Sequence, residues 1–148
     1  MIDRQLPYEH LVFEGGGVKG IAYAKIHKMD EALRSFDKAL SISEKKSTGY
    51  KVPINQHLYN IIAKSLVIKG YNDMADECRK IQKEFPSTSN EGFLNNLGYE
   101  FLKNKYYSEA IKIFVLNVEL YPNSANVYDS LAEAYMDAGD CEKAILNY

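Results

Sequence analysis

The residues with the clearest chemical potential form the glycine-rich stretch 11–24, which reads LVFEGGGVKGIAYA. Glycine lets backbone N–H groups approach a ligand closely, and a helix that begins after such a loop favours a bound anion. The spacing Gly15-x-Gly17-x-x-Gly20 matches a dinucleotide-binding pattern. However, no βαβ unit follows it, and the acidic residue near the required distance, Asp37, lies inside a helical pattern. The spacing therefore gives no adequate support for a nucleotide site.

The same stretch resembles the first motif of patatin-like phospholipases, in which an apolar strand leads into a glycine-rich loop and a helix. In that family the backbone N–H groups of the loop form an oxyanion hole, which stabilises negative charge in the transition state. The resemblance implies an oxyanion-hole-like loop made of Gly15, Gly16, Gly17, Lys19 and Gly20.

The catalytic partners of that loop are absent. The family uses a serine in a G-x-S-x-G elbow and an aspartate in a D-G-G or D-G-A motif, and the chain has neither. We therefore assign no catalytic residue and no cofactor. Two interpretations stay open: a hydrolase-like segment joined to another fold, or a loop before a shortened first helix. A fragment of a patatin-like lipid acyl hydrolase is kept as an alternative function.

The rest of the chain contains an internal repeat of small residues. Four pairs of glycine or alanine are each separated by 12 positions, and in three of them an aromatic residue follows the second member by four. Small residues allow two helices to pack closely, so each pair predicts a contact between two helices. The pairs are Gly20 and Ala32, Ala63 and Ala75, Gly98 and Ala110, and Ala132 and Ala144.

Consecutive units begin 35 and then 34 residues apart over the second half of the chain. Apolar residues recur at three- and four-residue spacing, which predicts two helices per unit. Lys103-Asn104-Lys105 suits the turn within one unit, and Pro122 ends its second helix. In the last unit Gly139 ends the first helix and Asp140 caps the second.

The stretches LNNLGYEFLKNKYYSEAIKIFVLNVELYP and VYDSLAEAYMDAGDCEKAILNY resemble tetratricopeptide repeats. The resemblance implies an all-α fold, a right-handed superhelical array of antiparallel helix pairs, or α-solenoid, preceded by an irregular glycine-rich segment. We expect an N-terminal segment at 1–17 and a repeat domain at 18–148. Its units span about 18–46, 56–89, 91–124 and 125–148, with a longer loop at 47–55.

In this family the first helices of the units line a concave face, where peptide or protein segments bind. We therefore expect a non-catalytic interaction scaffold with a protein or peptide partner. Asparagine amides can bond an extended backbone, and the charge changes from lysines to carboxylates along the array. The expected groove residues are Asn60, Lys64, Asn95, Asn96, Tyr99, Lys103, Asn126, Asp129 and Glu133.

The amino-acid composition indicates which kinds of partner and compartment to expect. The net charge is −2 and the lysines and arginines are dispersed, so we expect no nucleic-acid partner. No apolar run is long enough to span a bilayer, so we expect no integral membrane segment. Cys78 and Cys141 are 63 residues apart and show no metal-ligand spacing, which favours free thiols in the cytoplasm.

The last unit stops inside its second helix, and repeat arrays usually need a polar cap. We expect four residues there to be incompletely covered: Leu131, Tyr135, Ile145 and Tyr148. This end would then pack on another chain, or the protein would continue. A self-associating structural array is therefore a further alternative to the scaffold.

Overall fold

The computed structural model describes residues 29–47 and 54–148, and within these ranges it is entirely helical. The expected all-α class is therefore confirmed for this part of the chain. The glycine-rich loop, from Gly15 to Gly20, and most of the expected loop 47–55 lie outside the described residues. The helices are α2 (Met29–Ser47), α3 (Ile54–Ile68), α4 (Tyr71–Glu84), α5 (Glu91–Lys103), α6 (Tyr107–Leu120), α7 (Ala125–Asp137) and α8 (Cys141–Asn147).

Local chemistry sets the helix ends. The Asn90 side chain caps α5 by accepting a hydrogen bond from the Phe93 N–H at 3.0 Å. Asp140 caps α8 in the same way, accepting from the Lys143 N–H at 3.2 Å. Gly139, just before it, has φ of 84°, a conformation that glycine adopts without steric cost. The predicted turn between α7 and α8 is therefore confirmed.

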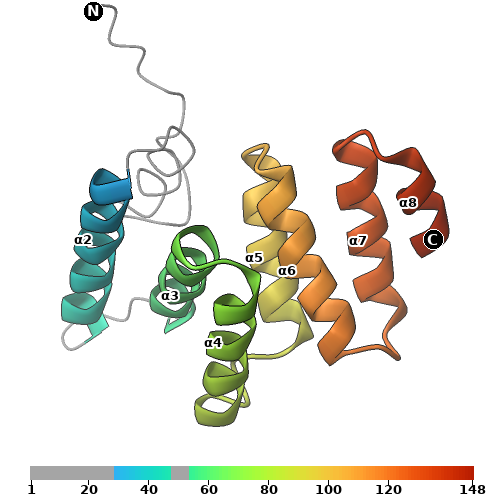
Figure 1. The fold of residues 1–148 in the computed structure, drawn as a ribbon. Coiled ribbons are helices and arrows are strands. Elements are labelled where there is room, and N and C mark those ends of the chain that lie inside the picture. The colour runs from blue at the N-terminus through green and yellow to red at the C-terminus, as the bar shows by residue number, and fades with distance from the viewer. Residues whose placement is uncertain (1–28, 48–53) are drawn as a thin grey trace, which may run out of the picture.

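The helices follow one another in a row that runs from α2 to α8 (Figure 1). Within this row α2 packs on α3, α3 on α4, α5 on α6, α6 on α7 and α7 on α8. The α5 helix also contacts α7, so these two helices are neighbours although α6 separates them in sequence. This contact brings polar residues of two different units to one surface.

The small residues of the repeat that lie within the described ranges are buried, as their spacing predicted. Ala63, Ala75, Ala110, Ala132 and Ala144 all lie in the core. Gly98 has the closest contact, because a Cβ built there would lie 2.5 Å from Cε1 of Phe114. The α5 backbone therefore rests directly on an aromatic ring of α6.

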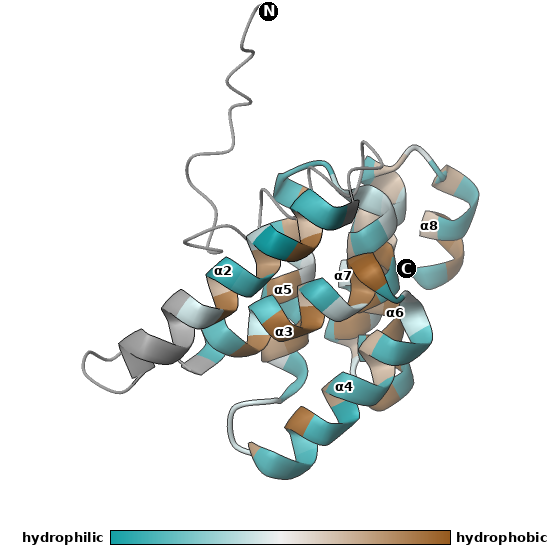
Figure 2. Cartoon of the chain, turned by 60° about the vertical axis from the view of Figure 1, so that its left-hand side comes forward, coloured by the Kyte–Doolittle hydropathy of each residue, from teal (hydrophilic) through white to brown (hydrophobic). Residues whose placement is uncertain are grey.

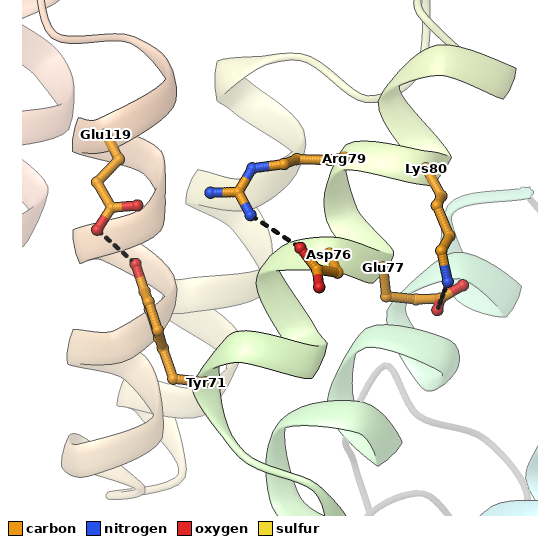
Figure 3. A network of polar contacts seen from close by, with 6 residues as sticks. All are labelled: Tyr71, Asp76, Glu77, Arg79, Lys80 and Glu119. Carbon is orange, nitrogen blue, oxygen red and sulfur yellow. Dashed lines mark hydrogen bonds and ion pairs between the residues drawn. The ribbon is translucent and has the colours of Figure 1, made fainter.

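Polar side chains connect α4 to α6 (Figure 3). The Tyr71 hydroxyl donates to Oε1 of Glu119 at 2.7 Å, and burial, helped by this carboxylate, raises the Tyr71 pKa. Gln82 Nε2 donates to the Tyr121 hydroxyl at 2.9 Å. The other pairs in this view, Asp76 with Arg79 and Glu77 with Lys80, stay within α4. Most of the α4 ribbon has the colour of hydrophilic residues (Figure 2).

Among the described helices, we find none that combines the length and the apolar character needed to cross a membrane.

Candidate functional site

The surface shared by α5 and α7 carries most of the polar residues expected in a binding groove. Asn96, Lys103, Asn126, Asp129 and Glu133 are exposed. Asn95 and Tyr99 of α5 are half-buried. Because α5 and α7 contact each other, these seven residues lie on neighbouring elements, and we call them the α5–α7 surface.

Tyr99 links the two helices of this surface. Its hydroxyl donates to Oε2 of Glu133 at 2.7 Å and lies 3.3 Å from Oγ of Ser130. Its ring meets Phe114 edge-on at a centroid distance of 5.2 Å. Burial raises the Tyr99 pKa, and the Glu133 carboxylate adds to that effect although the Ser130 hydrogen bond opposes it. Tyr99 therefore positions α7 against α5 and presents little free ring to a ligand.

A second polar contact joins the starts of the same helices. Asn126 Nδ2 donates to Oε1 of Glu91 at 2.7 Å. Both side chains are at the surface, where such a bond exchanges readily with water and contributes little to stability. The Asn126 amide could therefore turn toward a bound backbone at small cost.

Asn96 of the α5–α7 surface also interacts with α3. Its side chain hydrogen-bonds the Tyr59 hydroxyl, and this bond opposes the rise in the Tyr59 pKa that burial and Glu100 produce. The Tyr59 ring in turn packs on Phe93, with centroids 4.7 Å apart. The α5–α7 surface therefore extends toward α3 through Asn96.

Asn60 does not belong to an accessible surface. Its side chain is fully buried, and within the described residues neither its Oδ1 nor its Nδ2 has a hydrogen-bond partner. The expectation that Asn60 faces a groove is wrong for a physical reason. The α3 helix has apolar residues around most of its circumference, so the fold covers it on several sides.

Lys64 is half-buried and is already paired. Its ammonium group forms an ion pair with Asp37 of α2, whose side chain is well exposed. The contact ties α3 to α2 at the surface, where such pairs contribute only modestly. Lys64 is thus held in an ion pair with a neighbouring helix, whereas Lys103 of α5 is exposed.

The buried polar contacts between α5 and α6 were not predicted from the sequence. Asn117 of α6 is fully buried, and its Nδ2 donates to the Glu91 carbonyl at 3.1 Å. Tyr121 reaches the loop before α5, since its hydroxyl lies 3.3 Å from the Ser89 carbonyl. The only available signal was an asparagine on the apolar stripe of a helix, which indicates a buried polar bond.

A shallow hollow of about 580 Å³ opens where the start of α7 meets the end of α8. Asn126 and Asp129 of the α5–α7 surface line part of it. The remaining lining residues, which the sequence did not single out, are Ala125, Tyr128, Asn147 and Tyr148.

The apolar end of the chain is partly as expected. Ile145 and Tyr148 are exposed, which confirms the prediction for these two residues. Tyr135 is half-buried and its ring lies under the Lys143 ammonium, at 5.4 Å from the centroid. Leu131 is buried, so the expectation that it is uncovered is wrong, because its side of α7 packs into the core.

The cysteines show no sign of a metal or disulfide role. Both are free thiols, with Cys78 buried and Cys141 exposed. Burial, with a smaller effect from Glu77, raises the Cys78 pKa to about 12. Within residues 29–47 and 54–148, no group of three His, Cys, Asp or Glu side chains could hold a metal ion.

Comparison of the chain with known proteins gave no match, either to a family model or to a curated protein.

Proposed function

We propose that this chain is a non-catalytic scaffold that binds a peptide or protein segment along the α5–α7 surface. The supporting observation is the direct contact between α5 and α7, which are one unit apart and carry exposed polar side chains on adjacent helices. We further propose that the helices form a tetratricopeptide-like right-handed array whose concave side is this surface. We place the scaffold in the cytoplasm, in line with its two free thiols.

Repetition of one packing arrangement supports the proposed array. The pairs of small residues, whose two members are 12 positions apart, are buried in the second, third and fourth units. Helix pairs of this kind bury their apolar faces only by stacking on neighbouring pairs. The side of the stack formed by α5 and α7 then remains exposed.

The chemistry of the exposed residues suggests how a segment would bind. The amides of Asn96 and Asn126 can donate to and accept from the backbone of an extended peptide. Lys103 would attract an acidic residue of the ligand, whereas Asp129 and Glu133 would attract a basic one. Because the positive group lies on α5 and the negative groups lie on α7, the ligand would bind in one orientation. Asn60 and Lys64 are left out of this surface, since one is buried and the other is paired.

The proposal is tested by a triple substitution of exposed residues, Asn96→Ala, Lys103→Ala and Asn126→Ala. Proteins captured from the native host by the unmodified chain would be identified by mass spectrometry, and one purified partner would be titrated calorimetrically. We expect the triple variant to weaken that partner at least about tenfold, equivalent to about 1.4 kcal/mol. Its circular dichroism spectrum should be unchanged.

A matched control on another helix makes this test specific. Lys80→Ala, Lys83→Ala and Glu84→Ala change three exposed residues of α4. This control should bind the partner as the unmodified chain does. Equal loss in both variants, or unchanged binding by the first, would contradict the proposed surface.

The non-catalytic part of the proposal has its own test. A fluorophosphonate probe labels activated serines, and we expect no stoichiometric labelling of the folded chain. Labelling that disappears on unfolding would instead support the patatin-like alternative.

A further inference from the structure

The junction between α4 and α5 is built differently from the next junction along the chain. There, α6 packs closely on α7, and α5 also contacts α7. Of the two equivalent pairs one unit earlier, α4 with α5 and α3 with α5, neither packs closely in the part of the chain that the structure describes. The connecting segment is also longer, since it runs over 85–90, whereas the segment between α6 and α7 runs over 121–124. The second and third units are therefore joined mainly by side chains.

Two buried rings lie between the first helices of these units. Tyr59 of α3 packs on Phe93 of α5, with ring centroids 4.7 Å apart and the ring planes inclined by 37°. The equivalent positions at the next junction hold Leu94 and Val127, which are smaller and also buried. Because two rings take up more room than two aliphatic side chains, they keep α3 and α5 from the close approach that α5 and α7 make.

Hydrogen bonds between long side chains cross the junction on its α4 side. The Tyr71 hydroxyl, at the start of α4, donates to Oε1 of Glu119 of α6 at 2.7 Å (Figure 3). Near the end of α4, Gln82 Nε2 donates to the Tyr121 hydroxyl at 2.9 Å. The first bond is exposed and the second is partly buried. Because water can replace such partners, the net contribution of each bond is modest, and both can open at small cost.

Packing inside the two units is closer. Ala63 of α3 and Ala75 of α4 are both buried, and Gly98 of α5 lies directly against the Phe114 ring of α6. Tightly packed contacts of this kind resist gradual deformation, since any tilt of one helix forces atoms of the other to move. Movement is therefore expected between the second and third units and not within them.

We propose that the array bends at the α4–α5 junction, so that α2–α4 and α5–α8 move relative to each other as two bodies. The buried contact of Tyr59 with Phe93 is the pivot and stays closed. The hydrogen bonds that Tyr71 and Gln82 donate are latches, which open as the array bends. The segment 85–90 follows the motion, as hinge segments at the ends of packed elements do.

The bend acts on the proposed binding surface through Asn96. This residue belongs to the α5–α7 surface, and its side chain hydrogen-bonds the Tyr59 hydroxyl across the junction. A tilt of the Tyr59 ring shifts this hydroxyl relative to Asn96 and so frees the amide for a ligand. This consequence rests on the proposed function, whereas the bend itself does not and is tested without a partner.

The test measures distances between two spin labels on the full chain by double electron–electron resonance. One labelled pair, Lys80→Cys with Lys103→Cys, spans the α4–α5 junction. The matched pair, Lys112→Cys with Asp137→Cys, spans the α6–α7 junction, and position 137 is the equivalent of position 103 one unit later. All four positions are exposed. We expect a wider distribution of distances for the first pair than for the matched pair.

The native thiols do not interfere with this labelling. Cys141→Ser removes the exposed cysteine from both backgrounds, and the remaining Cys78 is buried. Singly labelled chains should therefore show no dipolar signal.

Two variants locate the latches. Tyr71→Phe with Gln82→Ala should widen the distribution across the α4–α5 junction further and leave that of the matched pair unchanged. Asp76→Ala with Lys83→Ala changes two exposed residues of the same helix and is the control, which should alter neither distribution. The helical circular dichroism signal should be the same in both variants, which separates bending from unfolding.

Three results would overturn the proposal: equal widths for the two labelled pairs, a latch variant that leaves the first distribution as it was, or the same widening in the control variant. Because no partner is present in these measurements, failure of the α5–α7 surface to bind a segment would leave their outcome intact.

Discussion

Gly98 of α5 lies directly on the ring of Phe114 of α6. A Cβ at position 98 would be 2.5 Å from Cε1 and 2.6 Å from Cζ of that ring. Phe114 is fully buried, so the ring has no free space into which it can move. The close approach of α5 and α6 therefore depends on the absence of a side chain at Gly98.

Substitution of Gly98 by valine should destabilise the fold. The added side chain must displace a packed ring, and such overpacking costs about 2–3 kcal/mol. The free energy of unfolding from urea titration measures the effect, with Lys103→Ala on the exposed side of the same helix as the control. Adding Phe114→Leu should recover part of the loss, because the two sites are in contact. Additive losses would show that the ring is not the cause.

The cap of α8 should depend on pH. The side-chain hydrogen bond from Lys143, followed by its backbone N–H bond, lowers the Asp140 pKa. A lowered pKa in the folded state means that the ionised cap stabilises the fold above the ordinary carboxyl pKa. This stabilisation disappears as the pH falls through the lowered value.

Asp140→Ala should therefore expose the amide protons of α8 to faster exchange at neutral pH. The difference between this variant and the unmodified chain should become smaller as the pH falls through the lowered Asp140 pKa, because the protonated carboxyl loses its ionic contact with Lys143. Asp140→Asn, which keeps an oxygen acceptor for the cap, serves as the control and should show a smaller change. A difference that stays the same from neutral to acidic pH would argue against the ionised cap.

The contact between Tyr99 and Glu133 should affect stability at neutral and at alkaline pH. Tyr99→Phe removes one hydrogen bond between α5 and α7 and should cost about 0.5–1.5 kcal/mol at neutral pH. Because the folded-state pKa of Tyr99 is raised, the unmodified chain should lose this contribution as the pH rises above about 10.

Thermal unfolding at pH 7 and at high pH checks this prediction. The melting temperatures of the unmodified chain and Tyr99→Phe should differ at pH 7 and converge in alkaline solution. Tyr128→Phe changes another half-buried tyrosine of the same region and is the matched control. A constant difference at both pH values would contradict the assignment.

The two cysteines should react at very different rates. Cys141 is exposed and should react with a thiol reagent in the folded chain. Cys78 is buried and its pKa is raised to about 12, so it should react only when the chain unfolds. Titration of thiols with and without denaturant should give one and two equivalents. Cys141→Ser should leave no fast-reacting thiol, and a fast thiol in that variant would show that Cys78 is accessible.

The sequence by itself determined the helical class of the described residues, several helix ends and the small buried contacts. These properties depend on neighbours along the chain. Asp140 caps the helix that follows it, and Gly139 adopts the positive φ that the turn requires. The recurrence of alanine and glycine at 12-residue spacing marked the close helix contacts, because only small side chains fit there.

Only the tertiary structure decided which polar side chains stay accessible. Asn60 occupies the same place in its unit as Asn95 and Asp129 but is fully buried, whereas Asp129 is exposed. Tyr99 and Lys64 have partners on other helices, 34 and 27 residues away in sequence. Helical periodicity identifies the faces of each helix, but the exposure of a face depends on distant segments that pack against it.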